Sequence, residues 1–363
     1  MGAAGALAAG CGGVNAATAA SPATTTGATT TTTPTATYPT LLAAMTGVNH
    51  HPVLGISPIT VKLDAPPATN TPRPTITPHV AGTWTTSGDA EIFTPASTLV
   101  PCTTYRLTVP AATFSTGQTP LTHAHHATLK VVCPDGLALQ EALARLAYLP
   151  FKMVTRYGMI NVGGKMTRAL AARHAFIPPH GRLVPTVHAV PHFVQGDGND
   201  PTTVGALEVF QENHGIDPTG VATAQTWRVL LADETVDRRD PHDYTWVSVT
   251  EGDPETLEVH VGHKVALSTP ANTGIPAAPT ALGTFPIYAR YVSTTMSGTN
   301  PDGTPYDDPG VPWVNYFNGG DAVHGFPRAS YGFAQSLGCV ELPISTAQSV
   351  YGMLQIGDIV QVE

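Results

Sequence analysis

The segment Ser336-Leu337-Gly338-Cys339-Val340-Glu341-Leu342-Pro343 places a cysteine between a glycine and the start of an apolar strand. Fifteen positions before this cysteine stands His324, in His324-Gly325-Phe326-Pro327. A thiol attacks a carbonyl as thiolate, so it needs a nearby base and backbone N–H groups that stabilise the oxyanion. We expect His324 to be that base and to keep Cys339 ionised. A buried structural cysteine is the alternative for a Cys considered alone, but the two motifs together favour a nucleophile.

These two motifs resemble the active-site signature of the YkuD-type L,D-transpeptidases, cysteine acyltransferases that cross-link peptidoglycan. The resemblance implies that Cys339 is the nucleophile and that His324 is the general base, with its second ring nitrogen held by the carbonyl of Gly325. It implies that Ser336 holds the catalytic turn by hydrogen bonds. The N–H groups of Gly338 and Cys339 are the expected oxyanion donors.

Two positions depart from the commonest family pattern. Leu337 stands where His is usual, and Glu341 stands where Arg or Asn is usual. Leucine has no group that could support the thiolate, so we expect it to shape the pocket wall. With Glu341 at this position, the site lacks the usual positive or amide group near the acyl donor. We expect this to affect which substrate charge the site accepts. Tyr316 adds a hydroxyl to the donor site, or is a core aromatic of a strand.

By this resemblance the chain forms 3→3 cross-links between peptidoglycan stem peptides through a thioester on Cys339. The implied partners are the donor and acceptor stems, with carbapenem-type β-lactams as covalent inhibitors; no metal or other cofactor is implied. Two alternatives stay open. The same site with water as acceptor would be an L,D-carboxypeptidase, and Leu337 could mark a catalytically degenerate, peptidoglycan-binding scaffold protein.

Residues 244–363 have the alternation of half-buried strands, and we expect a catalytic β-sandwich there. Helical content is expected mainly over 345–353. The expected strands are 246–250, 256–261, 264–268, 281–288, 313–317 and 357–362.

Composition favours a mainly β protein of two or three domains, because 34 Pro and 35 Gly indicate many turns and short strands. Only 12% of the residues are charged and the formal net charge is −9. The chain therefore offers no basic surface for a nucleic-acid partner.

The first 61 residues contain no Lys, Arg, Asp or Glu. Within residues 1–14, Leu7-Ala8-Ala9-Gly10-Cys11 resembles a lipobox, although Leu7 sits one place early and a basic segment is missing. A start annotated too far downstream would explain the missing segment. We expect lipidation of Cys11 and an exported chain in the cell envelope, anchored on the outer face of the cytoplasmic membrane and touching it through the lipid only. An uncharged leader with an incidental Cys is the alternative.

Residues 15–55, rich in Thr, Pro and Ala, are predicted to be a disordered tether. Residues 56–134 alternate apolar and polar positions between Pro and Gly, and they resemble the immunoglobulin-like modules of exported bacterial proteins. Cys102 and Cys133 lie at the ends of expected strands, and in an oxidising compartment we expect them to form a disulfide. His123, His125 and His126 could indicate a metal, but without a matching carboxylate or Cys a solvated loop is favoured.

Residues 135–240 resemble a small three-helix peptidoglycan-binding module. We expect three helices: the first begins at Gly136, the second spans 204–214, and the third includes Thr226–Leu231. The turn 215–220 lies between the second and the third. About 50 residues, roughly 151–203, are inserted where the compact module has a short loop. Sugar binding and a purely packing role are equally open for this module.

Overall fold

The fold is mainly β, in a computed structural model that describes residues 55, 57–63, 66–111, 123–155, 158–159, 181–187 and 189–363. The predicted lipobox with Cys11 and nearly all of the predicted tether lie outside the described residues, as does much of the insertion. Within the part that is described, no helix has both the length and the apolar character needed to cross a membrane.

The region predicted to be immunoglobulin-like consists of two three-stranded sheets, with strand orders β1-β4-β3 and β2-β5-β6. Alternate side chains of β1, β4 and β5 are buried, as expected for strands with one solvated face. The structure joins Cys102 to Cys133 by a disulfide, and His125 and His126 are exposed on β6. The strands are β1 (Ile59–Lys62), β2 (Thr75–Thr77), β3 (Gly82–Ser87), β4 (Ala90–Pro95), β5 (Thr104–Val109) and β6 (His125–Lys130).

Three helices follow in the module that resembles a peptidoglycan-binding domain. Each begins at a side chain that accepts a hydrogen bond from a backbone N–H of the first turn: Asp135, Asp200 and Thr223. Their apolar faces share one core with the two sheets before them. The helices are α1 (Gly136–Arg145), α3 (Pro201–Asn213) and α4 (Ala224–Val236), and all three were expected from the sequence.

The insertion holds a small sheet that sequence analysis did not anticipate. Its strands β7 (Phe151–Thr155), β8 (Gly158–Met159) and β9 (Arg182–Pro185) are ordered β8-β7-β9. A buried carboxylate fixes this sheet to α1, because Glu141 accepts a hydrogen bond of 2.5 Å from the N–H of Gly181.

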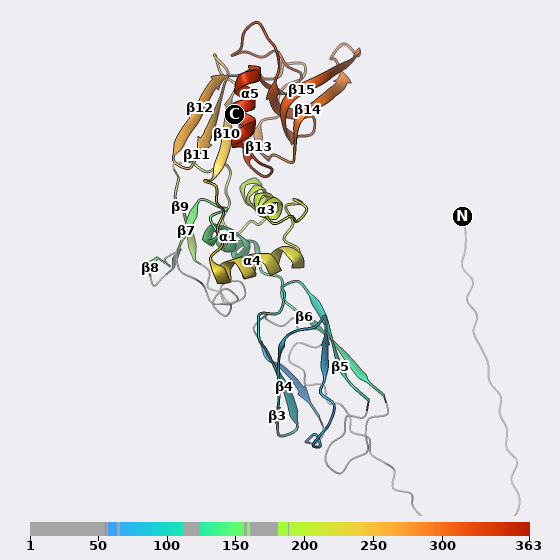
Figure 1. Cartoon of the computed structure of the whole chain (residues 1–363). Helices are drawn as coiled ribbons and strands as arrows, with labels where there is room; N and C mark the ends of the chain where they lie inside the picture. The colour runs from blue at the N-terminus through green and yellow to red at the C-terminus, as the bar shows by residue number, and fades with distance from the viewer. Residues whose placement is uncertain are drawn as a thin grey trace, which may run out of the picture. The chain divides into compact units, whose positions relative to one another are not determined.

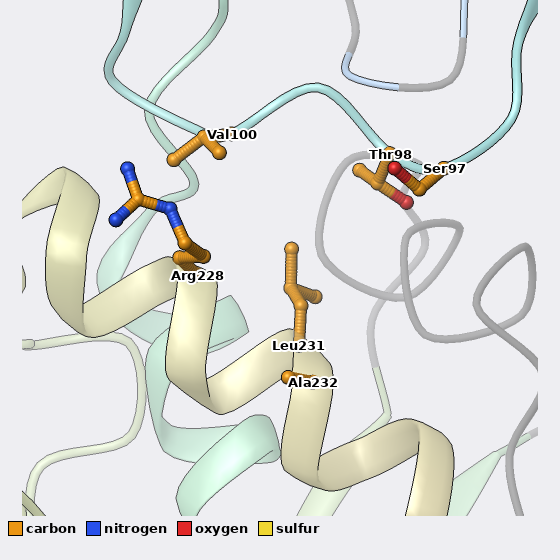
Figure 2. Close-up of a pocket in the computed structure, with 6 residues that line it drawn as sticks. All are labelled: Ser97, Thr98, Val100, Arg228, Leu231 and Ala232. Carbon is orange, nitrogen blue, oxygen red and sulfur yellow. The ribbon is translucent and has the colours of Figure 1, made fainter. Parts of the chain in front are cut away.

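A small pocket lies between the turn before β5 and α4. Figure 2 shows the α4 side chains of Arg228 and Leu231 facing Val100 and Thr98 across it. Arg228 is the one charged residue in its lining, so this pocket holds no acid–base pair.

The C-terminal region has two sheets with α5 (Ile344–Met353) between them (Figure 1). One sheet has the order β12-β11-β10-β18-β13 and the other β14-β15-β16-β17. The buried side chains of both sheets and of α5 form one core. The strands are β10 (Thr245–Thr250), β11 (Thr256–Val261), β12 (Lys264–Pro270), β13 (Gly283–Pro286), β14 (Ala289–Thr299), β15 (Pro305–Asn318), β16 (Asp321–Gly325), β17 (Val340–Leu342) and β18 (Ile359–Val362).

Helix α3 contacts this region closely at β13 and β18. The contact depends on two glycines: a Cβ added at Gly205 of α3 would lie 2.3 Å from the carbonyl oxygen of Gly357, just before β18. Backbone therefore meets backbone at this point, which only glycine allows.

Candidate active site

Two short parallel strands bring His324 and Cys339 together. Strand β16 pairs with β17 so that Val323 lies opposite Val340 and His324 opposite Glu341. Val323 and Val340 are fully buried in the core, and this fixes the register, because a shift by one residue would turn them to the opposite face of the sheet. Cys339, directly before β17, thus lies at the same sheet edge as His324.

Both residues line one open pocket of about 310 Å³. The hairpin of β14 and β15 forms one wall, with Met296, Tyr306 and Tyr316 among its side chains. Leu337 and Glu341 also line the pocket, so the structure places all three predicted substrate-binding residues in it. Among the described residues, no three His, Cys, Asp or Glu side chains are arranged to hold a metal ion.

His324 is buried and oriented by a backbone carbonyl. Its Nδ1 lies 3.0 Å from the carbonyl oxygen of Gly325, so Nδ1 carries the proton and donates it, and Nε2 holds the lone pair. Burial lowers the pKa of the imidazole below its ordinary value, and nearby Arg328 adds to this. The side chain is therefore a neutral base at physiological pH.

The thiol of Cys339 contacts the β15–β16 turn. Its Sγ lies 3.7 Å from the carbonyl oxygen of Gly320 and accepts a hydrogen bond from the N–H of Ala322. Burial raises the pKa of this thiol to about 12, and the carboxylates of Asp321 and Glu341 raise it too. The resting site thus holds a neutral thiol, whereas the sequence led us to expect a cysteine kept ionised by His324.

Ser336 holds the turn before Cys339. Its Oγ donates to the carbonyl oxygen of Cys339 (2.5 Å) and accepts from the N–H of Gly338 (3.2 Å). Gly338 has φ of +113°, a backbone conformation that disfavours any side chain. The sequence predicted the N–H of Gly338 as an oxyanion donor, but in the structure this N–H is directed at Ser336 instead. The N–H of Cys339 remains the candidate donor.

Glu341 is buried and paired with Arg328, a residue that sequence analysis did not single out. Arg328 donates from Nε and Nη2 to the two carboxylate oxygens, each at 2.7 Å, and its guanidinium lies 4.7 Å from the centre of the Phe326 ring. The sequence did contain a signal for this pair: Arg328 is the single Lys or Arg between residues 291 and 363.

Comparison with known proteins identifies two segments of the chain. Residues 243–362 match the family model of the L,D-transpeptidase catalytic domain (YkuD), and residues 197–230 match that of a peptidoglycan binding domain. A comparison with curated proteins gave no match.

Several solved structures are similar to the chain. The catalytic domain of an E. faecium L,D-transpeptidase is 29% identical over 34% of this chain and 100% of that one, with a TM-score of 0.31. The same domain acylated by ertapenem is 30% identical over 34% and 99%, with a TM-score of 0.30. An L,D-transpeptidase from Mycobacterium smegmatis is 15% identical over 88% and 98%, also with a TM-score of 0.30.

Proposed function

Because residues 243–362 belong to the L,D-transpeptidase catalytic-domain family, we propose that this chain is a cell-wall L,D-transpeptidase in which Cys339 is the nucleophile and His324 the general base. The observation that carries the assignment is their shared pocket. It holds a neutral imidazole whose Nδ1 is fixed on Gly325, and a thiol directly before the neighbouring strand.

In the first half of the proposed reaction, the Sγ of Cys339 attacks the carbonyl that joins the third stem residue to the terminal D-alanine. Nε2 of His324 takes the thiol proton as the S–C bond forms, since the thiol is not ionised beforehand. The N–H of Cys339 stabilises the oxyanion. The C–N bond then breaks, and the imidazolium returns the proton to the leaving D-alanine amine.

In the second half, the side-chain amine of another stem attacks the thioester and forms a 3→3 cross-link. His324 takes a proton from the attacking nitrogen and gives it to the departing sulfur, so the enzyme returns to its starting state. With water as acceptor the same steps would give a carboxypeptidase, and the products on isolated stems distinguish the two.

The remaining parts of the chain fit an exported enzyme of the cell envelope. The segment 197–230 provides attachment to peptidoglycan, and lipidation at Cys11 would hold the chain on the outer face of the cytoplasmic membrane. The thiol also makes the chain a target of carbapenems, in line with the ertapenem-acylated E. faecium domain.

The test is the mass of the intact protein after incubation with ertapenem, followed by analysis of products from tetrapeptide stems. The wild type should gain one adduct and release D-alanine, and Cys339→Ala should do neither. His324→Gln should acylate about 10² to 10⁴ times more slowly, the usual contribution of a positioned base. Cys11→Ala is the matched control, because it changes the one other cysteine outside the disulfide and leaves Cys339 in place.

Release of D-alanine by Cys339→Ala at the wild-type rate would refute the proposal. A wild-type chain that binds peptidoglycan but is never acylated would instead support the scaffold protein that Leu337 leaves open.

A further inference from the structure

The turn that holds the thiol of Cys339 carries a carboxylate of unassigned role. Gly320 and Ala322 provide the two backbone contacts to Sγ, and Asp321 lies between them. Its side chain reaches the catalytic turn, because a Cβ added at Gly338 would lie 2.5 Å from Asp321 Oδ1. Asp321 also lines the active-site pocket.

The orientation of Asp321 is fixed by two neutral groups. Its Oδ2 accepts hydrogen bonds from the N–H of Ala281 (3.2 Å) and from Nδ2 of Asn318 (3.4 Å), which leaves Oδ1 on the side of Gly338 and Cys339. No cationic side chain pairs with Asp321 within the described ranges. The arginine of the pocket, Arg328, is occupied by Glu341.

This carboxylate opposes the first half of the reaction. A negative charge beside Cys339 disfavours the thiolate and raises the pKa of the thiol. The surrounding segment supplies little positive charge to offset this carboxylate, since residues 291–363 contain seven Asp or Glu and one Arg. A charge that hinders acylation is expected to contribute to a different step.

That step is the attack of the acceptor amine on the thioester. A primary side-chain amine has an ordinary pKa of about 10.4 and arrives as an ammonium ion. An ammonium is a compact charge with three N–H donors, and a carboxylate with a free oxygen is its complementary partner. Water, the competing acceptor, is uncharged, so it binds such a carboxylate far more weakly than an ammonium does.

Starting from the proposed function, we infer that Asp321 binds the ammonium of the acyl acceptor beside the thioester and so favours the amine over water. The ammonium gives one proton to solvent through Asp321. The resulting amine attacks the thioester carbonyl; the C–N bond forms, the C–S bond breaks, and His324 carries the second amine proton to sulfur. One amide, one thiol and one released proton result.

Asp321→Asn tests this, with Asp307→Asn as the control for charge alone, because Asp307 is exposed on the hairpin and does not line the pocket. In Asp321→Asn, ertapenem acylation should be as fast as in the wild type or faster. The KM for the amine-bearing acceptor should rise about twofold to fivefold, the loss of one partly screened ion pair, and hydrolysed stems should increase relative to cross-linked ones. Asp321→Glu should restore part of the acceptor binding.

Preserved acylation would show that Asp321→Asn is folded, so a changed product ratio would be a direct effect. Equal losses of acylation and cross-linking would mean that Asp321 only supports the turn, and an unchanged KM for the acceptor would also overturn the inference. Failure of the wild type itself to acylate would refute the proposed function, which is a separate outcome.

Discussion

Cys339, the proposed nucleophile, has surroundings that keep its proton in place. Burial and the carboxylates of Asp321 and Glu341 all favour the neutral thiol, and His324 is kept neutral by its own burial. In the proposed reaction the thiol and the imidazole therefore meet the substrate uncharged, and the proton moves only as the S–C bond forms.

This state predicts how alkylation of Cys339 depends on pH. In a Cys11→Ala background, where Cys102 and Cys133 are bridged, the rate with iodoacetamide should rise about tenfold per pH unit from pH 6 to pH 9, because only the rare thiolate reacts. Stopped-flow alkylation checked by peptide mapping measures this. A rate that is high and constant below neutral pH would reveal a Cys–His ion pair instead.

Site residues could be predicted where one motif is sufficient to define them. Cys339, His324 and Ser336 stand in two short motifs, so the sequence was enough to single them out, and the structure places Cys339 and His324 in one pocket. Arg328 and Asp321 act through contacts with residues 13 and 17 positions away, and those contacts exist only after β16 and β17 pair.

At the scale of elements, alternation of apolar residues located most strands of the two C-terminal sheets. It could not predict β14, because nearly all of its side chains are exposed or half-exposed and no buried face repeats along it. The same limit applies to β7 and β9, short strands in a long insertion. These elements form through pairing with their neighbours, and β14 builds a wall of the catalytic pocket.

Two helical glycines should respond in opposite directions to the same substitution. Gly352→Ala in α5 should stabilise the protein by about 0.5–1 kcal/mol, because alanine is the better helix former and the added methyl meets nothing within 4 Å. Gly205→Ala in α3 should destabilise it, since its methyl would overlap the Gly357 carbonyl. Urea unfolding followed by circular dichroism compares the two, and stabilisation by Gly205→Ala would contradict the close contact.

At the scale of the whole molecule, the described part of the chain has two main hydrophobic cores. One joins the two N-terminal sheets to α1, α3 and α4, and the other lies within the catalytic region around Val323 and Val340. His324 lies on β16 and Cys339 directly before β17, two strands of the second core, and Cys339 also packs against a small cluster around Val314 and Ala322. Damage to the first core should therefore leave the chemistry largely intact.

The disulfide between Cys102 and Cys133 allows a direct test, because it lies beside the first core and closes a loop of 31 residues. Replacing both cysteines with serine should cost about 3–4 kcal/mol by loop-entropy arguments and lower the temperature at which the N-terminal part unfolds. The rate of ertapenem acylation should change by less than about twofold. Calorimetry and intact mass measure the two effects on the same samples, with Asp307→Asn as a variant that keeps the bridge. A parallel fall in stability and acylation rate would show that the two cores act as one unit, and that the N-terminal part helps to shape the pocket around Cys339.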